Sequence, residues 1–599
     1  MRSPARVLNS LTKHSQTTEY RFERLYRILF NEEMYYLAYQ RIYAKPGNMT
    51  QGADGKTIDR MSLSRIEKLI ASLKDESYSP QPSRRMYIPK KNGKTRPLGV
   101  PSFDDKLVQE VVRMVLEAIY EGHFEDTSHG FRPHRSCHTA LNAVQKTFTG
   151  KKWFIEGDIK GFFDNVNHDI LIDILKERIS DERFIRLIRK FLKAGYLEQW
   201  QFHGTYSGMP QGGIISPILA NIYLDKLDKY MKEYASKFDK GDRGRQQREY
   251  EVLTYQKRLV MRELKTATNN VERKVLVKRL KEIDKTRSAM PCFDPMDGNF
   301  KRLKYVRYAD DFLIGIIVSK VKIKDDIKRF LADRLALELS DEKTLVTHTE
   351  KPAKFLGYEV TVRRSNLQKR NKRGSLSRVY GNKVRLKVTT EVIKKKLLEL
   401  GVLKFSYHNG HEQWIPKHRS ELINNDDLEI LDSYNAEIRG FYNYYSIANN
   451  ASELNTFHYI MQYSMYKTFA GKYRTTVRRI CRKYKRNGVF TVGYTVKNGK
   501  AKERRLYNEG FKRKRPSYDR SIDRCPNPMP GVSTTSLIDR LKAQKCELCG
   551  ATDNLVMHHV RKLGELKGKE NWEKLMIARR RKTMAVCGSC HQKIHHGTF

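Results

Sequence analysis

The chain has 599 residues, more than one hydrophobic core usually supports, so we expect several domains. Its 116 lysines and arginines against 68 acidic residues give a net charge of +48, far beyond what solubility needs, and this predicts RNA or DNA as a partner. The 39% hydrophobic content argues against wholesale disorder, and we find neither a membrane-spanning apolar run nor a secretory apolar block.

Residues 21–224 have the pattern of a mixed α+β region. Helical apolar spacing alternates there with short strand-like runs, and Gly or Pro turns separate them. Arg84, Lys90 and Arg96 surround a turn at 88–93. A basic hairpin of this kind could close over a nucleotide triphosphate with charge-assisted hydrogen bonds, and a solvated basic turn is the alternative.

Three aspartates stand at the ends of strand-like runs. Asp158 follows the apolar run 153–155, and Asp310 and Asp311 occupy the turn of an apolar strand–turn–strand segment at 304–314. Adjacent carboxylates repel each other by about 4 kcal/mol at ~4 Å and an effective dielectric of ~20, and a divalent cation removes that conflict. Two Mg²⁺ ions held by such oxygens could activate a primer 3′-hydroxyl and stabilise a leaving pyrophosphate, although one Asp-Asp turn alone is weak evidence.

The middle and later parts of the chain change in composition. Residues 231–290 are dense in Lys, Arg and Glu, which predicts an extended charged helical pair inserted between two catalytic segments, with an RNA contact as an alternative to simple solvation. Strands resume at Leu303. Beyond about residue 364 the chain is strongly basic, helical patterns follow between 392 and 484, and a Pro/Gly-rich linker lies at 526–531.

Taken together, these motifs resemble those of reverse transcriptases. Residues 308–311 match the Y-x-D-D signature, Asp158 matches the aspartate of the first metal-binding motif, and residues 207–221 look like the P-Q-G segment that lines the nascent base pair. Three motifs in the right order are far more specific than any one. The resemblance implies an α+β right-hand polymerase with an antiparallel palm sheet.

The same resemblance assigns individual residues. It implies that Mg²⁺ is held by Asp158, Ile159, Asp310 and Asp311. Triphosphate and base-pair contacts fall on Arg84, Lys90, Arg96 and Gln211. Phe163 matches the aromatic gate that excludes a ribose 2′-hydroxyl, so the substrates should be dNTPs, and an ordinary core Phe is the alternative. Lys343 resembles the lysine that protonates pyrophosphate as a general acid.

Further segments resemble group II intron-encoded proteins of the mitochondrial-like class. Residues 124–138 look like the block between fingers and palm, residues 25–44 resemble an extra fingers segment, and residues 434–445 are similar to the maturase (X, or thumb) signature. There Arg439 and clustered tyrosines such as Tyr434 and Tyr444 offer phosphate contacts and stacking surfaces for RNA, with an aromatic helix core as the alternative. The resemblance implies reverse transcription, maturase activity and intron insertion into DNA.

The C-terminal tail carries two C-x-x-C pairs, a strong signal for tetrahedral structural Zn²⁺: Cys546, Cys549, Cys587 and Cys590. The tail resembles an HNH endonuclease. By that pattern His558, with His591 or His595, binds a catalytic divalent ion, and His559 is the general base. The family's Asn should fall at Lys582 or Thr583, and Asn571 is too distant to replace it. A structural DNA-binding zinc module is therefore the alternative to an active nuclease.

The expected architecture has four parts. They are fingers and palm at 1–365 with a charged insertion at about 231–300, a thumb or maturase domain at 366–480, a basic DNA-binding region with linker at 481–540, and a zinc-bound HNH (ββα-metal) domain at 541–599.

We expect the intron RNA, target DNA and dNTPs as partners, with a homodimer left open. The expected cofactors are Zn²⁺ and Mg²⁺, the latter also in the nuclease, whose nick would supply the 3′-hydroxyl for copying. A bacterial cytoplasmic ribonucleoprotein is expected. A mitochondrial presequence is the alternative, because Arg2, Arg6 and Lys13 precede the first acidic residue, Glu19. Two other functions remain, an RNA-binding splicing factor with a vestigial polymerase and a retron or defence-associated reverse transcriptase.

Overall fold

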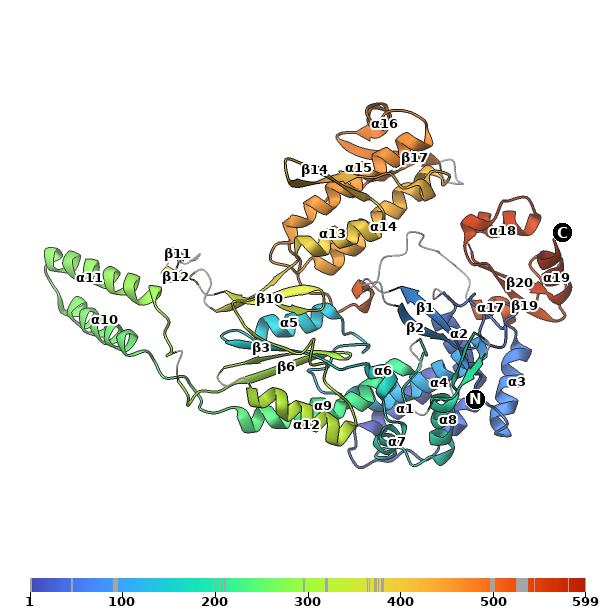
Figure 1. Cartoon of the computed structure of the whole chain (residues 1–599), viewed down its shortest axis with the longest axis horizontal. Helices are drawn as coiled ribbons and strands as arrows, with labels where there is room; N and C mark the ends of the chain where they lie inside the picture. Colours follow the sequence, from blue (N-terminus) through green and yellow to red (C-terminus); the bar gives the residue numbers. More distant parts are fainter. Residues whose placement is uncertain are drawn as a thin grey trace.

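The structure is a computed structural model of the chain (Figure 1). It describes residues 3–44, 47–89, 95–199, 201–205, 207–209, 212–294, 297–317, 321–363, 365, 367–370, 374, 376–378, 382–495, 501–523, 537–542, 544–579 and 581–597.

The N-terminal region is built around one long helix, α4 (Phe103–Tyr120), whose apolar residues are buried on several faces. Three helices contact it, two from before Asp158 in the chain and one from after it, namely α1 (Pro4–Ser15), α2 (Glu32–Ile42) and α9 (Ser216–Phe238). Further helices of this region are α3 (Leu63–Lys74), α5 (Cys137–Thr147), α6 (Phe162–Asn165), α7 (His168–Lys176), α8 (Glu182–Lys193) and α12 (Val321–Leu335).

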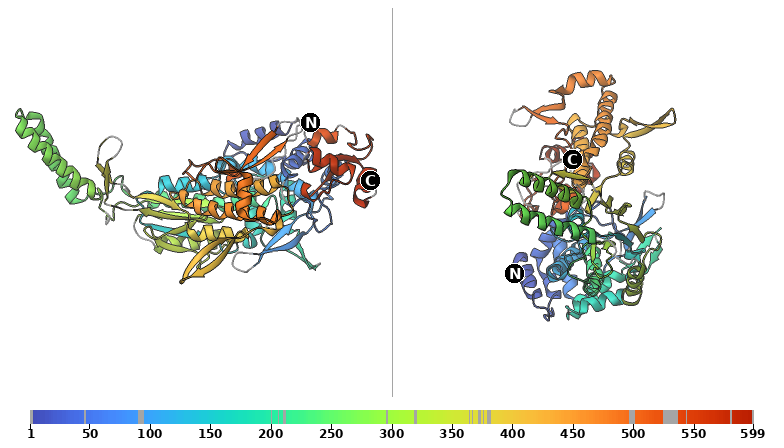
Figure 2. Two further views of the ribbon diagram at one scale, coloured as in Figure 1. Left: turned by 90° about the horizontal axis from the view of Figure 1, so that it is seen from above. Right: turned by 90° about the vertical axis from the view of Figure 1, so that its left-hand side faces the viewer.

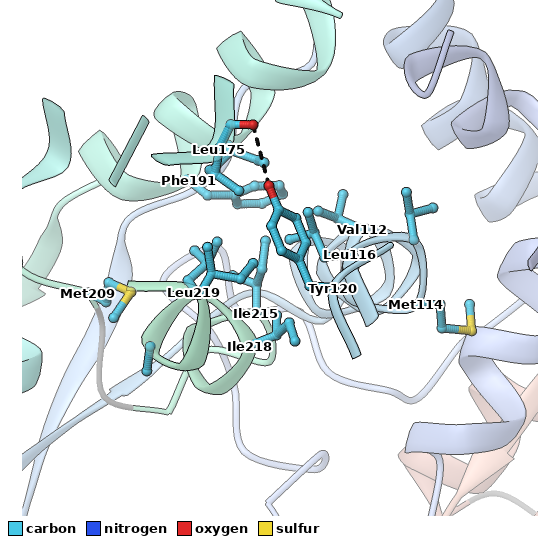
Figure 3. Close-up of a cluster of buried hydrophobic side chains, with 14 of the residues drawn as sticks. Val112, Met114, Leu116, Tyr120, Leu175, Phe191, Met209, Ile215, Ile218 and Leu219 are labelled. Atoms are coloured by element: carbon cyan, nitrogen blue, oxygen red, sulfur yellow. Dashed lines mark hydrogen bonds between the residues drawn. The ribbon is translucent and has the colours of Figure 1, made fainter. Parts of the chain in front are cut away.

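Figure 3 shows part of the resulting apolar core. Side chains of α4 such as Val112 and Leu116 meet Phe191 of α8 and Leu219 of α9. The hydroxyl of Tyr120 donates a hydrogen bond to the carbonyl of Leu175 at 3.3 Å, so the one polar atom of that ring is satisfied inside the core.

An antiparallel sheet in the order β6-β7-β3-β8 carries the aspartates. Its strands are β3 (Trp153–Asp158), β6 (Leu303–Tyr308), β7 (Asp311–Ile316) and β8 (Leu345–His348). The strand–turn–strand predicted at 304–314 is confirmed. We call this sheet the catalytic sheet.

Two further sheets are formed by neighbouring parts of the chain. The order β2-β1-β4-β5 joins β1 (Ser83–Pro89), β2 (Thr95–Val100), β4 (Tyr196–Glu198) and β5 (Gln201–His203). The order β13-β10-β9 joins β9 (Ala353–Phe355), β10 (Tyr358–Arg363) and β13 (Lys383–Lys387). A short pair, β11 (Gln368–Arg370) and β12 (Leu376–Arg378), lies between β10 and β13 in the sequence.

The charged insertion forms the predicted helical pair. Helices α10 (Arg248–Thr266) and α11 (Asn270–Ala289) project far from the catalytic sheet as an arm, seen clearly in Figure 2. The arm has a small core of its own, made up of Val260, Ala267, Leu276 and Ile283. Most of its remaining surface is charged and exposed, as both simple solvation and an RNA contact require.

The maturase-like region lies above the catalytic sheet in Figure 1. Its helices are α13 (Thr390–Glu399), α14 (Asp427–Tyr445), α15 (Leu454–Lys472) and α16 (Val477–Tyr484). Its strands are β14 (Leu403–His408), β15 (His411–Pro416), β16 (Lys485–Arg486), β17 (Val489–Thr495) and β18 (Ala501–Arg505).

Two of the expected domain boundaries do not separate independent structural units. Strand β10, before the boundary at 365, pairs along its length with β13, after it. Across the boundary at 480, Asn435 of α14 donates to the carbonyl of Arg505 at 3.0 Å and accepts from the backbone N–H of Tyr507 at 2.8 Å. Charge and proline content mark surface segments, and these need not coincide with the limits of a shared core.

The C-terminal region is small and lies beside the N-terminal helices (Figure 1). It contains α17 (Leu537–Lys542), β19 (Leu555–His559), α18 (Asn571–Arg579), β20 (Thr583–Cys587) and α19 (Gly588–His596). Strands β19 and β20 pair antiparallel, α18 lies between them in the chain, and α19 follows β20 directly. None of the helices in the described parts of the chain is long and apolar enough to cross a lipid bilayer.

A buried ion pair joins the catalytic sheet to α9. The guanidinium of Arg307, fully buried on β6, donates to both carboxylate oxygens of Asp228, at 2.8 and 2.5 Å. Burial by itself would lower the pKa of Arg307, but the charge of Asp228 outweighs it and raises that pKa. Breaking such a pair from one side leaves an uncompensated charge in the core.

We therefore expect Asp228→Asn to lower the free energy of opening of the catalytic sheet by about 3–5 kcal/mol. Hydrogen–deuterium exchange of the amides in β6 and β7 measures this. The matched control is Lys237→Ala, which removes the exposed pair with Glu233 on the same helix and should leave that exchange unchanged. Equal protection of the sheet in both variants would contradict the assignment.

Candidate polymerase and nuclease sites

The catalytic sheet brings the three predicted aspartates to one end. Asp158, the last residue of β3, pairs directly across from Asp311, the first residue of β7. Residues directly opposite in antiparallel strands project to the same face with their Cβ atoms ~5 Å apart. Asp310 precedes Asp311 in the turn, so carboxylates of two strands and one turn gather at this edge.

The turn is held in place from three directions. Ala309 has a positive φ of +58°, and its carbonyl accepts a hydrogen bond from Arg307 at 2.8 Å. A Cβ on Gly130 would lie 2.3 Å from the backbone nitrogen of Ala309, so only glycine allows this approach. Likewise a Cβ on Gly157 would overlap the Phe312 ring at 2.0 Å. The geometry of the turn is thus built by residues outside the motif itself.

The electrostatics of this end are those of crowded carboxylates. Desolvation within the site, followed by the charges of Asp310 and Asp158, raises the pKa of Asp311 to about 7. The positive charge of Lys343 acts in the other direction and lowers the pKa of Asp311. The ammonium of Lys343 lies 2.8 Å from a carboxylate oxygen of Asp158. The hydrogen bond to Asp158 in turn raises the pKa of Lys343. Hard carboxylate oxygens in this arrangement fit divalent cations of the Mg²⁺ type. Ile159 could add only its main-chain carbonyl, because its hydrocarbon side chain has no ligand atom.

The segment after Asp158 packs against the P-Q-G segment. The carbonyl of Phe163, on α6, accepts from the backbone N–H of Met209 at 2.6 Å, and that of Val166 accepts from Gly208 at 2.8 Å. The Phe163 ring lies edge-on to Phe162, with centroids 5.2 Å apart, and is half-buried. Gln211 lies outside the described residues.

The basic hairpin is present as β1 and β2. Arg84 is half-buried on β1 and pairs with Val100, and Arg96 lies on β2 opposite Ile88. Lys90, in the connection between the strands, lies outside the described residues.

The predicted RNA-binding residues of α14 differ in how far their side chains are exposed to solvent. Arg439 is exposed, as expected. Tyr434 is fully buried, with its hydroxyl 2.8 Å from Ser464 Oγ, so the prediction of a stacking surface at Tyr434 is wrong for this structure. Tyr444 is half-buried and donates to the carbonyl of Leu356 at 3.0 Å, which joins α14 to the β9–β10 connection. A helix rich in tyrosine has the same sequence pattern whether its rings face solvent or core.

The cysteines of the C-terminal region converge as the two-pair pattern predicts. The Sγ atoms of Cys546, Cys549, Cys587 and Cys590 all lie within 4.8 Å of one another. The backbone N–H groups of Cys549 and Cys590 each point at the first sulfur of their own pair, at 3.5 Å. Although burial opposes it, backbone N–H groups lower the pKa of Cys546 to about 7, and thiolates of this kind are zinc ligands.

A second cluster gathers the histidines and adds a residue that the sequence did not indicate. Ligand atoms of His558, His591, His595 and Asp59 all lie within 4.8 Å of one another. His591 and His595 place Nε2 at 3.0 and 2.9 Å from Asp59 Oδ2. Asp59 belongs to the N-terminal region, about five hundred positions away in the chain, so no local spacing could have revealed it.

His559, the predicted general base, is next to this cluster but enclosed. Its Nδ1 lies 3.1 Å from the carbonyl of Met557 and its Nε2 lies 3.0 Å from the hydroxyl of Tyr39. Burial lowers the pKa of His559 to about 4, so the ring is neutral, as a proton acceptor must be. On β20 the residue opposite His559 is Thr583, where the family's Asn was sought.

Three family descriptions match successive parts of the chain. Residues 88–255 match "Reverse transcriptase (RNA-dependent DNA polymerase)", a span that ends inside the arm before the Asp310–Asp311 turn. Residues 382–515 match "Type II intron maturase", and residues 546–591 match "AI2M/AI1M-like, HNH endonuclease". The class of protein is therefore a reverse transcriptase that also carries a maturase region and an HNH endonuclease region.

Full-length relatives make the assignment more specific. The chain is 44% identical over 606 residues to the group II intron-encoded protein LtrA of Lactococcus lactis subsp. cremoris, covering 100% of both. It is 34% identical to a putative COX1/OXI3 intron 1 protein of Saccharomyces cerevisiae, over 96% of this chain and 69% of that protein. The chain belongs to the family of group II intron-encoded proteins, with reverse transcriptase, maturase and HNH endonuclease regions that serve intron mobility.

The cysteine cluster gives a direct test. We expect Cys587→Ser to remove one equivalent of zinc, measured by elemental analysis, and to make residues 544–597 sensitive to protease. Metal binding stabilises small zinc peptides by roughly 10–16 kcal/mol, and this region is too small to replace that with a core. Cys481→Ser, at a half-buried cysteine on α16, is the control and should keep both properties. Unchanged zinc content in Cys587→Ser would refute the site.

Proposed function

We propose that the catalytic sheet is the palm of a right-hand polymerase in which Asp158, Asp310 and Asp311, with the carbonyl of Ile159, hold two Mg²⁺ ions. The observation that carries this is the direct cross-strand pairing of Asp158 with Asp311, beside Asp310. When bound, the ions would activate a primer 3′-hydroxyl and stabilise the leaving pyrophosphate. By this proposal β1 and β2 belong to the fingers and α13–α15 form the thumb.

The protein's own groups then have defined tasks. Lys343, whose ammonium lies 2.8 Å from Asp158, is placed to give a proton to the leaving pyrophosphate. Phe163, anchored through its carbonyl to Met209, selects dNTPs by occupying the space of a ribose 2′-hydroxyl. Triphosphate and base-pair contacts are proposed for Arg84, Lys90, Arg96 and Gln211.

We expect Asp310→Asn to reduce dNTP incorporation on a primed RNA template by about 10³-fold or more, because a lost ligand removes several kcal/mol of stabilisation of the transition state. The assay uses the full chain with Mg²⁺. Glu338→Gln, an exposed acid whose partner is Lys160, is the control and should keep full activity. Undiminished incorporation by Asp310→Asn would end the metal-site assignment, whereas no incorporation by the unchanged protein would favour the alternative of a splicing factor with a vestigial polymerase.

We further propose that the C-terminal region nicks one strand of target DNA and so supplies the 3′-hydroxyl from which intron RNA is copied. His558, His591 and His595 hold the nuclease ion, and His559 takes the proton from the attacking water. Three imidazoles favour a first-row transition ion over Mg²⁺, which prefers oxygen ligands, so we revise the expectation of Mg²⁺ at this site.

We expect His559→Ala to reduce nicking of target DNA by about 10²–10⁴-fold, the usual contribution of a general base. Extension of a primer supplied separately should be unaffected, because the residues that His559 contacts in the N-terminal region, Tyr39 and Asp59, are not among the proposed polymerase residues. Both reactions are measured on the full chain assembled with the intron RNA that encodes it. Loss of both reactions together would indicate misfolding, and unchanged nicking would remove His559 from the mechanism.

For intron RNA, the proposed surface shifts from Tyr434 to exposed residues of the same region. Arg439 on α14 is exposed, and Tyr459 and Tyr463 on α15 are 52% and 37% exposed with ring centroids 4.6 Å apart. Exposed aromatic rings are suited to stacking on unpaired bases, and an exposed guanidinium is suited to binding phosphates.

A further inference from the structure

The C-terminal region contacts the N-terminal region through backbone as well as side chains. Helix α17 packs against α2, and the backbone N–H of Met557 donates to the carbonyl of Met61 at 2.8 Å. Two residues later, the N–H of His559 donates to Asp59 Oδ1 at 2.8 Å. Both Met61 and Met557 are fully buried. The two regions are thus joined by a short strand-like contact directly beside the nuclease residues.

This contact inserts a carboxylate among the histidines. Asp59 lies 3.0 and 2.9 Å from Nε2 of His591 and His595, and 3.5 Å from Nδ1 of His558. His558 is 3% exposed, and neither of its ring nitrogens has a hydrogen-bond partner among the described residues. Buried polar groups are almost always satisfied, so an imidazole left in this way beside two others and a carboxylate is the mark of a metal ligand.

We propose that Asp59, from the polymerase part of the chain, is the fourth ligand of the nuclease's metal ion and closes that site while the two regions are docked. The proposal rests on the proposed function in one respect, that His558, His591 and His595 hold the nuclease ion. Three imidazoles and one carboxylate make a complete tetrahedral set for a first-row transition ion such as Zn²⁺.

A complete set has a functional consequence. Catalytic metal sites keep one position open for water or substrate, whereas closed four-ligand sites are structural. With Asp59 bound, a DNA phosphate has no position on the ion, and the hydroxyl of Tyr39 already occupies Nε2 of His559. The docked arrangement is therefore a resting state of the nuclease, and cleavage requires that the C-terminal region leave Asp59.

Metal binding tests the ligand assignment without reference to activity. The full chain is loaded with one equivalent of Zn²⁺, which the four cysteine thiolates take up, and is then titrated with Co²⁺. Co²⁺ absorbs visible light strongly when tetrahedral and weakly when octahedral, as at carboxylate sites. We expect an intense visible band without thiolate charge transfer, and we expect Asp59→Ala to lose most of that intensity and to bind Co²⁺ at least tenfold more weakly. Glu67→Ala, at an exposed acid on α3, is the matched control and should resemble the unchanged chain.

A third variant distinguishes a failure of the Asp59 assignment from a failure of the proposed nuclease site. His558→Ala should abolish the tetrahedral band. If it does so while Asp59→Ala keeps both the band and the affinity, Asp59 is no ligand and the inference is overturned, with the nuclease site intact. If His558→Ala also binds Co²⁺ normally, the nuclease site itself is wrong.

A disulfide between the two regions tests whether the docked arrangement keeps the nuclease inactive. Met61 and Met557 form an antiparallel bridge, a geometry that brings Cα atoms within the usual range for a disulfide. In the double variant Met61→Cys with Met557→Cys, oxidation should stop nicking of target DNA by the assembled ribonucleoprotein, and reduction should restore it, while primer extension continues in both states. The unchanged protein under the same treatments is the control. Equal nicking by the oxidised and reduced double variant would overturn the claim that the docked arrangement is a resting state.

Discussion

The ion pair between Arg307 and Asp228 is the interaction on which the polymerase site depends. The same guanidinium also donates to Ser128 Oγ at 2.8 Å and to the carbonyl of Ala309 at 2.8 Å. One buried cation therefore positions strand β6, helix α9, the segment around Ser128 and the turn that carries the aspartates. Such a group is costly to bury alone, so the four segments must assemble together for it to be satisfied.

The parts of this molecule that sequence predicted well are those encoded by neighbouring residues. The strand–turn–strand around Asp310, the charged helical pair and the two cysteine pairs each depend on spacing within a short segment, where periodicity and ligand distance restrict the outcome. Lys343 was placed through a family resemblance, and its ammonium does lie beside Asp158.

The parts that were missed depend on contacts between distant segments. Asp59 has no motif around it, and only the docking of the C-terminal region gives it three histidine neighbours. Tyr434 sits in a tyrosine-rich helix, where the sequence does not distinguish a ring that packs on Ser464 from one that faces solvent. The boundaries expected near 365 and 480 follow the basic composition of the sequence, yet strand pairing and side-chain hydrogen bonds continue across them.

The arm is closed at its base. Lys240 and Lys301 exchange backbone hydrogen bonds at 3.0 and 3.1 Å, and the N–H of Leu303 donates to Asp239 at 2.7 Å, just where β6 begins. The two ends of the insertion are therefore fixed side by side regardless of what lies between them, and lengthening a loop whose ends are already joined costs little. Apart from the contact of α11 with β12 and the hydrogen bond that Gln368 donates to the carbonyl of Lys285, the segment beyond this base can therefore be shortened or exchanged while the polymerase keeps its shape.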